Sequence, residues 1–273
     1  MTFNDGETEK TVTIDVTGDT TEEEHEGFTV TLSNPSNSGT ISTSSADGAI
    51  RDDETARFNT TSTAQLSNSI HEGGPADNAD YYGTGNDDDF SEYGIASFTI
   101  TKSDLGLANG TVDSIDTFEY TLTHNDRGFS DGNEVEFFLV TDVFGGDFNS
   151  LTFNTGLVNG IDNGQYTTAP TSLGTFSYTP EAGGTRTTFS IDFSTRASAE
   201  QAIIDKLNAG EEFSIIIAAT AAETDATFSG VDNGFDPGDP ELAVTVEGTP
   251  SDEPDFAIAA DDADKDEGDS GTT

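Results

Sequence analysis

Acidic side chains gather in short runs along this chain, and their carboxylates are the groups best suited to chemistry. One acidic stretch lies within residues 21–26, a second occupies residues 52–54, and two more occupy residues 87–89 and 232–241. Ca²⁺ takes about six to eight oxygen ligands, so a site needs several carboxylates that converge from separate loops. Runs of charge are more commonly solvated surface. The runs alone therefore leave two interpretations open, a calcium site or an acidic surface.

The two runs in the middle of the chain favour the second interpretation. Asp87, Asp88 and Asp89 follow a glycine-rich segment, and their loop has no EF-hand spacing. The preceding sequence does not repeat, as a nonapeptide calcium motif would. We therefore interpret residues 83–92 as a surface loop, and residues 232–241 in the same way.

The sequence gives no support for an enzyme. His25 lies within an acidic loop, where a solvated or ion-paired role is favoured over that of a base. His71 and His124 are isolated, and no GxSxG or HExxH motif accompanies them. A glycosidase would need one pair of carboxylates, but 53 acidic residues make chance pairs common and none stands out. We expect this chain to be non-catalytic.

Charge and composition restrict the possible partners. Nine Lys and Arg against 53 Asp and Glu give a net charge of −44, which excludes the basic track that nucleic acids require. No apolar run approaches the roughly 20 residues that span a bilayer, so we expect no membrane insertion. The chain has no cysteine, which excludes disulfides and thiolate sites. Most acidic residues must form a generally acidic surface, as in proteins secreted into salt water.

Alternating apolar and polar residues, separated by Gly, Thr, Ser, Asn and Asp, predict an all-β chain with antiparallel sheets packed as a β-sandwich. One short helix is predicted over Ala199 to Leu207, capped by Ser198 and Gln201 and ended by residues 208–210. The predicted strands of the central region cover residues 56–59, 93–100, 114–123, 135–141, 152–153, 172–179, 187–193, 212–219 and 242–246.

The central region also suggests a carbohydrate-binding function. Its strand blocks, such as "SIDTFEYTLTH" and "VEFFLVTD", resemble jelly-roll-like domains of secreted bacterial proteins, which share the architecture of carbohydrate-binding modules. Sugar platforms use exposed aromatic rings. The tyrosines that could serve are Tyr81, Tyr82, Tyr93, Tyr166 and Tyr178. A carbohydrate-binding module is thus the alternative function for this region, and a secreted hydrolase with its catalytic domain elsewhere is a third.

The N-terminal sequence "FNDGETEKTVTIDVTGDTTEEEHEGFTVTLSNPS" and the later "GAIRDDE" resemble the second half of a Calx-beta domain. This calcium-binding β-sandwich with an Ig-like fold occurs in sodium–calcium exchangers and in bacterial surface proteins. The segment "DFAIA" followed by "DADKDEGDSGTT" resembles the start of another repeat. We therefore expect a partial Calx-beta repeat at 1–54, a central β-sandwich at 55–248, a linker at 249–254 and a further repeat that begins at 255–273.

The resemblance implies a set of Ca²⁺ ligands at one pole of each module. The residues that match the family's acidic positions are Asp19, Glu23, Asp52, Asp53, Glu54 and Glu267, the last in the following repeat. Gly18 stands where the family often has a second acid, and Glu54 is longer than the usual Asp. A solvated acidic loop and linker remain the alternative.

The resemblance implies a role as well. We expect an internal segment of a large, secreted bacterial surface, adhesion or matrix protein, with both true termini missing. Ca²⁺ at the junctions would stiffen the array, and other surface proteins or an extracellular polysaccharide would be its partners.

Overall fold

A computed structural model describes residues 17–18, 26–35, 41, 43–51, 55–67, 80–85, 91–107, 110–125, 131–148, 150–151, 165–221, 224–231, 238–249, 264–266 and 271–272. The chain divides into two compact units. Unit 1 comprises residues 1–54 and 252–273, and unit 2 comprises residues 55–251.

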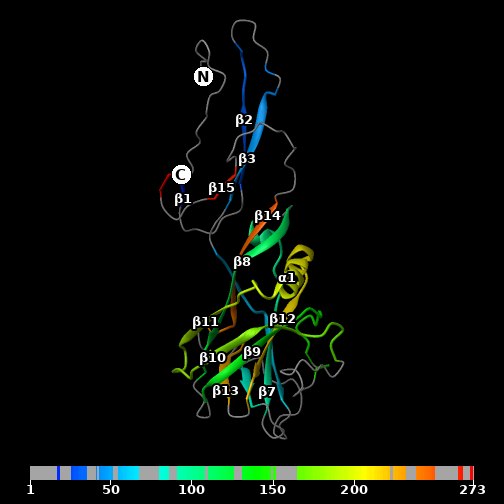
Figure 1. Cartoon of the computed structure of the whole chain (residues 1–273), viewed down its shortest axis with the longest axis vertical. Coiled ribbons are helices and arrows are strands. Elements are labelled where there is room, and N and C mark those ends of the chain that lie inside the picture. Colours follow the sequence, from blue (N-terminus) through cyan, green and yellow to red (C-terminus); the bar gives the residue numbers. More distant parts are fainter. Residues whose placement is uncertain are drawn as a thin grey trace. The chain divides into compact units, whose positions relative to one another are not determined.

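Unit 1 contains strands from both ends of the chain (Figure 1). β2 (Glu26–Thr31) pairs antiparallel with β3 (Ser45–Arg51), and β15 (Asp264–Asp266) runs parallel to β3. β1 (Thr17–Gly18) pairs with β16 (Gly271–Thr272). The C-terminal strands therefore pair with N-terminal ones, while the predicted domain boundaries remain predictions.

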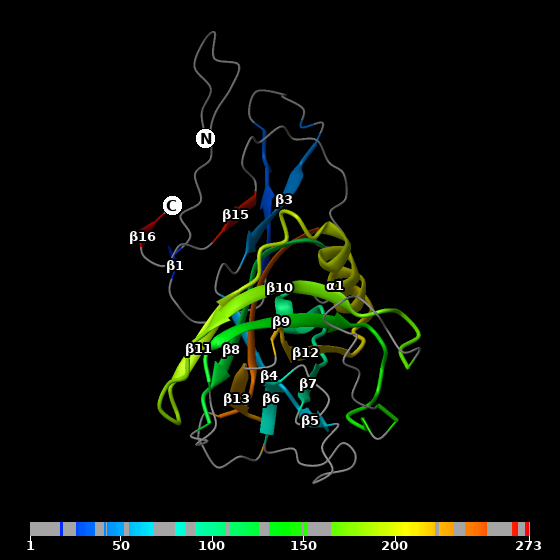
Figure 2. The same cartoon turned by 60° about the horizontal axis from the view of Figure 1, so that its bottom comes forward.

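Two antiparallel sheets form unit 2, a seven-stranded sheet and a four-stranded sheet (Figure 2). The larger sheet has the order β10-β9-β12-β7-β6-β13, and β5 pairs with β7 outside this path. Its strands are β5 (Ser62–Ser67), β6 (Asp80–Thr84), β7 (Glu92–Phe98), β9 (Asn133–Val140), β10 (Thr171–Tyr178), β12 (Phe213–Ala219) and β13 (Asp225–Ser229). The smaller sheet has the order β11-β8-β14-β4, with β4 (Ala56–Asn59), β8 (Thr111–Thr123), β11 (Arg186–Ser190) and β14 (Glu241–Thr249).

The main core lies between these two sheets and is rich in aromatic rings. Tyr120 of β8 meets Phe98 of β7 and Phe137 of β9 edge-on, with ring centroids 6.0 and 5.4 Å apart. Phe189 of β11 lies 5.1 Å from Phe137 in the same geometry. Edge-to-face contacts suit the ring quadrupoles and add to the burial of apolar area. Rings from both sheets interdigitate, which makes unit 2 a β-sandwich.

The seven-stranded sheet is buried on its second face too. Tyr93, Ile95, Phe138 and Ile216 point away from the main core and form a separate apolar cluster. The segment after β9 covers this cluster with Phe148 and Leu151. The central strands of this sheet therefore pack against side chains on both faces.

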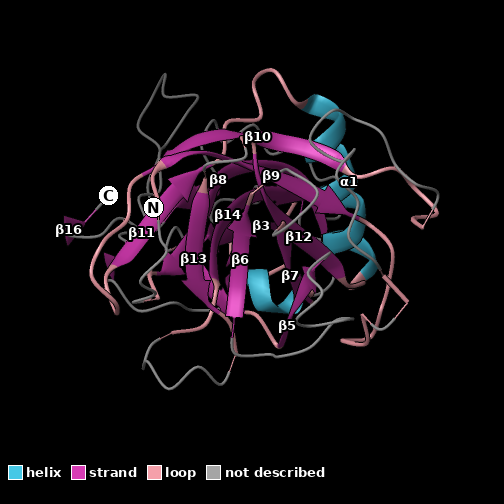
Figure 3. Cartoon of the chain, turned by 90° about the horizontal axis from the view of Figure 1, so that it is seen from below, coloured by secondary structure: helices cyan, strands magenta, loops and turns pink. Residues whose placement is uncertain are grey.

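Among the described residues, the single α-helix is α1 (Ala197–Ala209), which lies beside the sandwich (Figures 1 and 3). Its apolar face, including Ile203 and Leu207, joins the main core. Arg196 is the N-cap residue and makes no side-chain capping bond, so the capping role predicted for Ser198 is wrong. Gly210 ends it with a φ of 62°, as its place after the last apolar residue predicts. A short 3₁₀ turn, η1 (Ser103–Leu105), is also present.

The prediction of an all-β, antiparallel fold with one short helix is confirmed. β4 has the predicted bounds, and the other predicted strands differ by a few residues at their ends. The expected strand at residues 152–153 lies outside the described residues. β5, β6 and β13 were not predicted, because their sequences lack alternating apolar residues. Within the described part of the chain, no helix is both long and apolar enough to cross a bilayer.

Candidate functional site

The six predicted Ca²⁺ ligands lie outside the described residues: Asp19, Glu23, Asp52, Asp53, Glu54 and Glu267. Residues 86–90 and 232–237, which hold most of the two central acidic runs, also lie outside them. The described strands β2 and β3 lie close to these acids in sequence. In the described ranges, no three His, Asp or Glu side chains lie together in a way that could hold a metal ion. The predicted ligand set thus remains a prediction.

The five tyrosines proposed as a sugar platform are all buried. Tyr81 is fully covered and donates a hydrogen bond from its hydroxyl to the backbone oxygen of Ile215, 3.1 Å away. The other four are at most 6% exposed: Tyr82, Tyr93, Tyr166 and Tyr178. A stacking platform needs exposed ring faces, so the prediction that these tyrosines form one is wrong.

His124, at the end of β8, is buried and fully hydrogen-bonded. Its Nδ1 accepts the backbone N–H of Glu181 at 3.3 Å, which places the proton of the neutral ring on Nε2. Nε2 lies 2.8 Å from Thr187 Oγ1. Burial lowers the pKa of His124, and the nearby Glu181 carboxylate opposes part of that shift. With the ring stacked on Tyr178, this histidine is a structural residue and not an available base.

An open depression of about 570 Å³ lies at the end of β9 in unit 2 and is here called the β9 depression. It draws its side chains from the segment after β9, the segment before β10, and α1. The lining residues are Thr141, Asp142, Val143, Phe144, Ser150, Thr167, Thr168 and Lys206.

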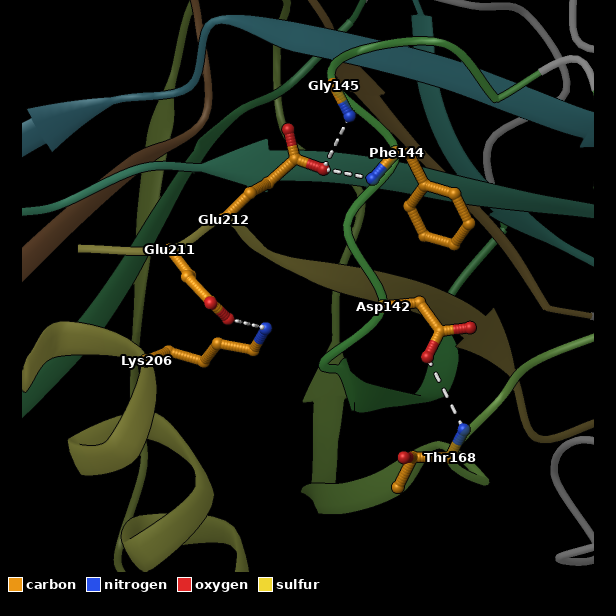
Figure 4. Close-up of polar contacts among 7 residues, drawn as sticks. All are labelled: Asp142, Phe144, Gly145, Thr168, Lys206, Glu211 and Glu212. Carbon is orange, nitrogen blue, oxygen red and sulfur yellow. Dashed lines mark hydrogen bonds and ion pairs between the residues drawn. The ribbon is translucent and has the colours of Figure 1, made fainter. Parts of the chain in front are cut away.

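Two carboxylates hold the walls of the β9 depression in place (Figure 4). Asp142 accepts the backbone N–H groups of Thr167 at 2.7 Å and Thr168 at 3.4 Å. Glu212 accepts those of Phe144 at 2.6 Å and Gly145 at 3.0 Å, both through Oε1. A carboxylate oxygen that accepts a backbone amide forms a charge-assisted bond, roughly twice as strong as a neutral one. The Asp142 bonds join the segment after β9 to the segment before β10, and the Glu212 bonds join the former to the start of β12.

Lys206 supplies the single cation of the depression. Its ammonium lies 2.9 Å from Glu211 Oε2 (Figure 4), and its side chain is only 12% exposed. An ammonium has three N–H donors. Glu211 neutralises this ammonium, so the described part of the depression has no unpaired cation.

Sequence reasoning missed this depression because its residues come from three distant segments. Asp142, Thr168 and Lys206 carry no motif, and each alone resembles ordinary surface. The one local signal is the apolar pair Val143-Phe144 in a segment that is otherwise rich in Gly and Asp. That pair does not alternate with polar residues, so it lies outside any predicted strand.

Comparison with known protein families confirms the N-terminal resemblance. The model of the Calx-beta domain matches residues 1–54 of this chain. The match covers the partial repeat expected there and includes five of the six predicted Ca²⁺ ligands. Calx-beta domains are β-sandwich modules associated with calcium binding. Comparison with curated proteins gives no match.

Proposed function

We propose that this chain is a non-catalytic segment of a large extracellular, repetitive surface, adhesion or matrix protein, of bacterial origin. In this proposal, Ca²⁺ binds at the junctions of Calx-beta modules and stiffens the array. Unit 2 stands between two Calx-beta segments as an inserted module.

The Calx-beta match at residues 1–54 is the observation that carries this proposal. The acids Asp52, Asp53 and Glu54 end the matched segment, directly before unit 2 begins. Three adjacent carboxylates at a junction supply the hard oxygen ligands that Ca²⁺ prefers. A run of this kind at a domain boundary suits an ion that links neighbouring modules.

The pairing of the positive side chains in unit 2 supports the binding of a cation from solution. The described Lys and Arg side chains of unit 2 all have partners within the chain: Arg57 and Arg186 with Glu241, Lys206 with Glu211, Lys102 with the backbone oxygen of Gly110, and Arg196 with that of Asp192. They are therefore not available to neutralise a cluster of carboxylates at residues 52–54. A divalent ion can do so.

The proposed mechanism follows from electrostatics. Without Ca²⁺, the carboxylates at a junction repel one another and the adjoining segments move independently. Bound Ca²⁺ neutralises them and ties their loops to one centre. Extracellular modules work with weak sites, with dissociation constants of about 10⁻⁴ to 10⁻³ M, because calcium outside cells is abundant.

Calcium titration of the chelator-treated chain by isothermal calorimetry tests the proposal. We expect saturable Ca²⁺ binding with a dissociation constant of about 10⁻⁴ to 10⁻³ M, and weaker binding of Mg²⁺, which demands a stricter octahedral geometry. The double variant Asp52→Asn with Asp53→Asn should weaken Ca²⁺ binding at least about tenfold, a loss of roughly 1.4 kcal/mol.

A matched control removes two charges elsewhere. Asp116 and Glu134 are exposed on unit 2, so Asp116→Asn with Glu134→Gln should leave Ca²⁺ binding unchanged. Equal heats for Ca²⁺ and Mg²⁺, with no effect of the changes at 52 and 53, would show diffuse counterion binding and reject the proposal.

A further inference from the structure

We propose that the β9 depression of unit 2 binds a neutral oligosaccharide, through an apolar wall at Val143 and Phe144 and a polar rim of hydroxyls and one carboxylate. This site is separate from the calcium ligands of the proposed function and does not depend on them.

The apolar wall is the first reason. Val143 is 60% exposed, and among the described residues of unit 2 it is the one large hydrophobic side chain on the surface. Beside it, the half-buried ring of Phe144 lines the same depression and packs on Phe148, with centroids 5.5 Å apart. Val143 and Phe144 are thus adjacent apolar residues among otherwise polar lining residues, and ligand sites combine apolar side chains with a few polar groups. The C–H faces of a pyranose ring suit such a wall.

The polar rim is the second reason. Four hydroxyls line the depression, on Thr141, Ser150, Thr167 and Thr168, and within the described residues none of them makes a side-chain hydrogen bond. A hydroxyl offers one donor and two acceptor positions, and each carboxylate oxygen of Asp142 keeps a lone pair beyond its bond to an amide. Sugar hydroxyls both donate and accept, so they match this mixture better than a purely anionic or purely cationic ligand would.

The charge of the site selects a neutral sugar. Lys206 is paired with Glu211, and Asp142 leaves the rim negative. The chain as a whole carries a net charge of −44, which repels anionic polymers. A uronic acid or sulfated glycan would therefore meet repulsion without a free cation to bind it.

The walls are already in place before a ligand arrives. Asp142 holds the backbone of Thr167. Figure 4 shows Asp142 holding the backbone of Thr168, and Glu212 that of Phe144 and Gly145. Loops fixed in this way lose little conformational freedom on binding, which favours affinity. The depression of about 570 Å³ is open to solvent, which suits an oligosaccharide that lies along the surface.

The experiment uses the whole chain and four neutral trisaccharides: maltotriose, cellotriose, mannotriose and xylotriose, with trigalacturonic acid as the anionic comparison. Saturation-transfer NMR detects binding, and calorimetry measures affinity. We expect at least one neutral trisaccharide to bind and the anionic one not to bind. Val143→Asp places a charge on the apolar wall and should weaken binding at least tenfold.

Two further variants keep the result interpretable. Thr99→Asp makes a similar change at an exposed position outside the depression and should bind within twofold of the unchanged chain. Thr168→Val removes one rim hydroxyl while leaving its backbone bond to Asp142, and should weaken binding about threefold to tenfold, as the loss of one hydrogen bond does. Absence of binding by all four neutral sugars at 10 mM, equal binding of trigalacturonic acid, or undiminished binding by both Val143→Asp and Thr168→Val would overturn the proposal.

Discussion

His124 illustrates how one residue can make stability depend on pH. Its Nδ1 accepts a backbone N–H and its ring lies between Tyr178 and Phe228, with centroids 5.7 and 4.9 Å away. Protonation of Nδ1 would remove the acceptor for the Glu181 N–H and place a charge among apolar rings. The neutral ring is therefore preferred in the folded state, which is why its pKa is lowered.

The lowered pKa of His124 predicts that acid destabilises unit 2. Above the unfolded-state pKa of about 6.5, the ring is neutral in both states and adds no pH dependence. As the pH falls below that value, the unfolded chain binds the proton first, so the free energy of unfolding decreases by up to about 1.4 kcal/mol per pH unit. Urea unfolding between pH 7.5 and 5.5 measures this slope.

A background of His25→Asn and His71→Asn isolates the effect, because His124 is then the sole imidazole. Its C2 proton should titrate in NMR with a midpoint below 6.5. Adding His124→Asn should flatten the slope near pH 6. A midpoint above 6.5 would contradict the burial argument.

At this scale the sequence predicted residue chemistry poorly. His124 carries no sequence sign of burial, since it follows a strand and precedes polar Asn125 and Asp126. The five tyrosines were considered as a surface platform that could bind sugar, yet all of them are buried. Whether a tyrosine or histidine ring is buried or exposed depends on how distant segments pack against it, and the local sequence does not contain that information.

Among the elements, α1 is fixed to the smaller sheet at its C-terminal end by Asn208. The side-chain amide of Asn208 donates to the backbone oxygen of Val112 and accepts its N–H, both at 2.9 Å. Val112 lies at the start of β8. On the side that faces the helix, its backbone N–H and oxygen would otherwise have no neighbouring strand to bond with. The helix therefore substitutes for a neighbouring strand at this point.

Replacing Asn208 by Ala should lower the free energy of unfolding by about 1–3 kcal/mol, because it leaves a part-buried N–H and oxygen without partners. Urea unfolding followed by circular dichroism measures the change. Asn59→Ala is the matched control: this asparagine is exposed at the end of β4, and its loss should cost less than about 0.5 kcal/mol. Equal effects of the two changes would show that the bidentate contact is not stabilising.

The elements themselves were more predictable where apolar residues alternate. Phe118, Tyr120 and Leu122 gave β8 its core face. In β9, Phe137 and Leu139 face the main core, and Phe138 on the opposite face is buried in the second cluster. The sequences "STAQLS", "DYYGT" and "DATFS" bury small polar residues such as Thr63 and Thr227, so hydrophobic periodicity could not identify their strands.

For the whole molecule, acidic surface is the dominant electrostatic feature. The net charge is −44, and the described cations of unit 2 are already bonded to acceptors within the chain. Exposed ion pairs such as Arg57 with Glu241 contribute only about 0–1 kcal/mol each. Repulsion among the remaining carboxylates therefore opposes folding unless salt screens it.

Raising NaCl from 10 mM to 1 M should stabilise the chain, because the Debye length falls from about 30 Å to about 3 Å. We expect a gain of more than about 1 kcal/mol, or roughly 2–4 °C in the unfolding temperature of a domain of this size. Thermal unfolding followed by circular dichroism checks this. CaCl₂ at matched ionic strength separates screening from specific binding, and an unfolding temperature that is flat in NaCl would contradict the repulsion argument.

The chain enters unit 2 at β4 and leaves it after β14, and these two strands are paired. Ala56, the first residue of β4, is paired with Val244 of β14, and Thr55 touches Thr245 through their hydroxyls at 3.2 Å. Tension applied along the polypeptide would therefore break the hydrogen bonds between β4 and β14 one after another, instead of loading all of them at once. β14 is also held by β8 along its length, so β4 would peel away first. Such a module would lengthen under small loads and rejoin when they are released.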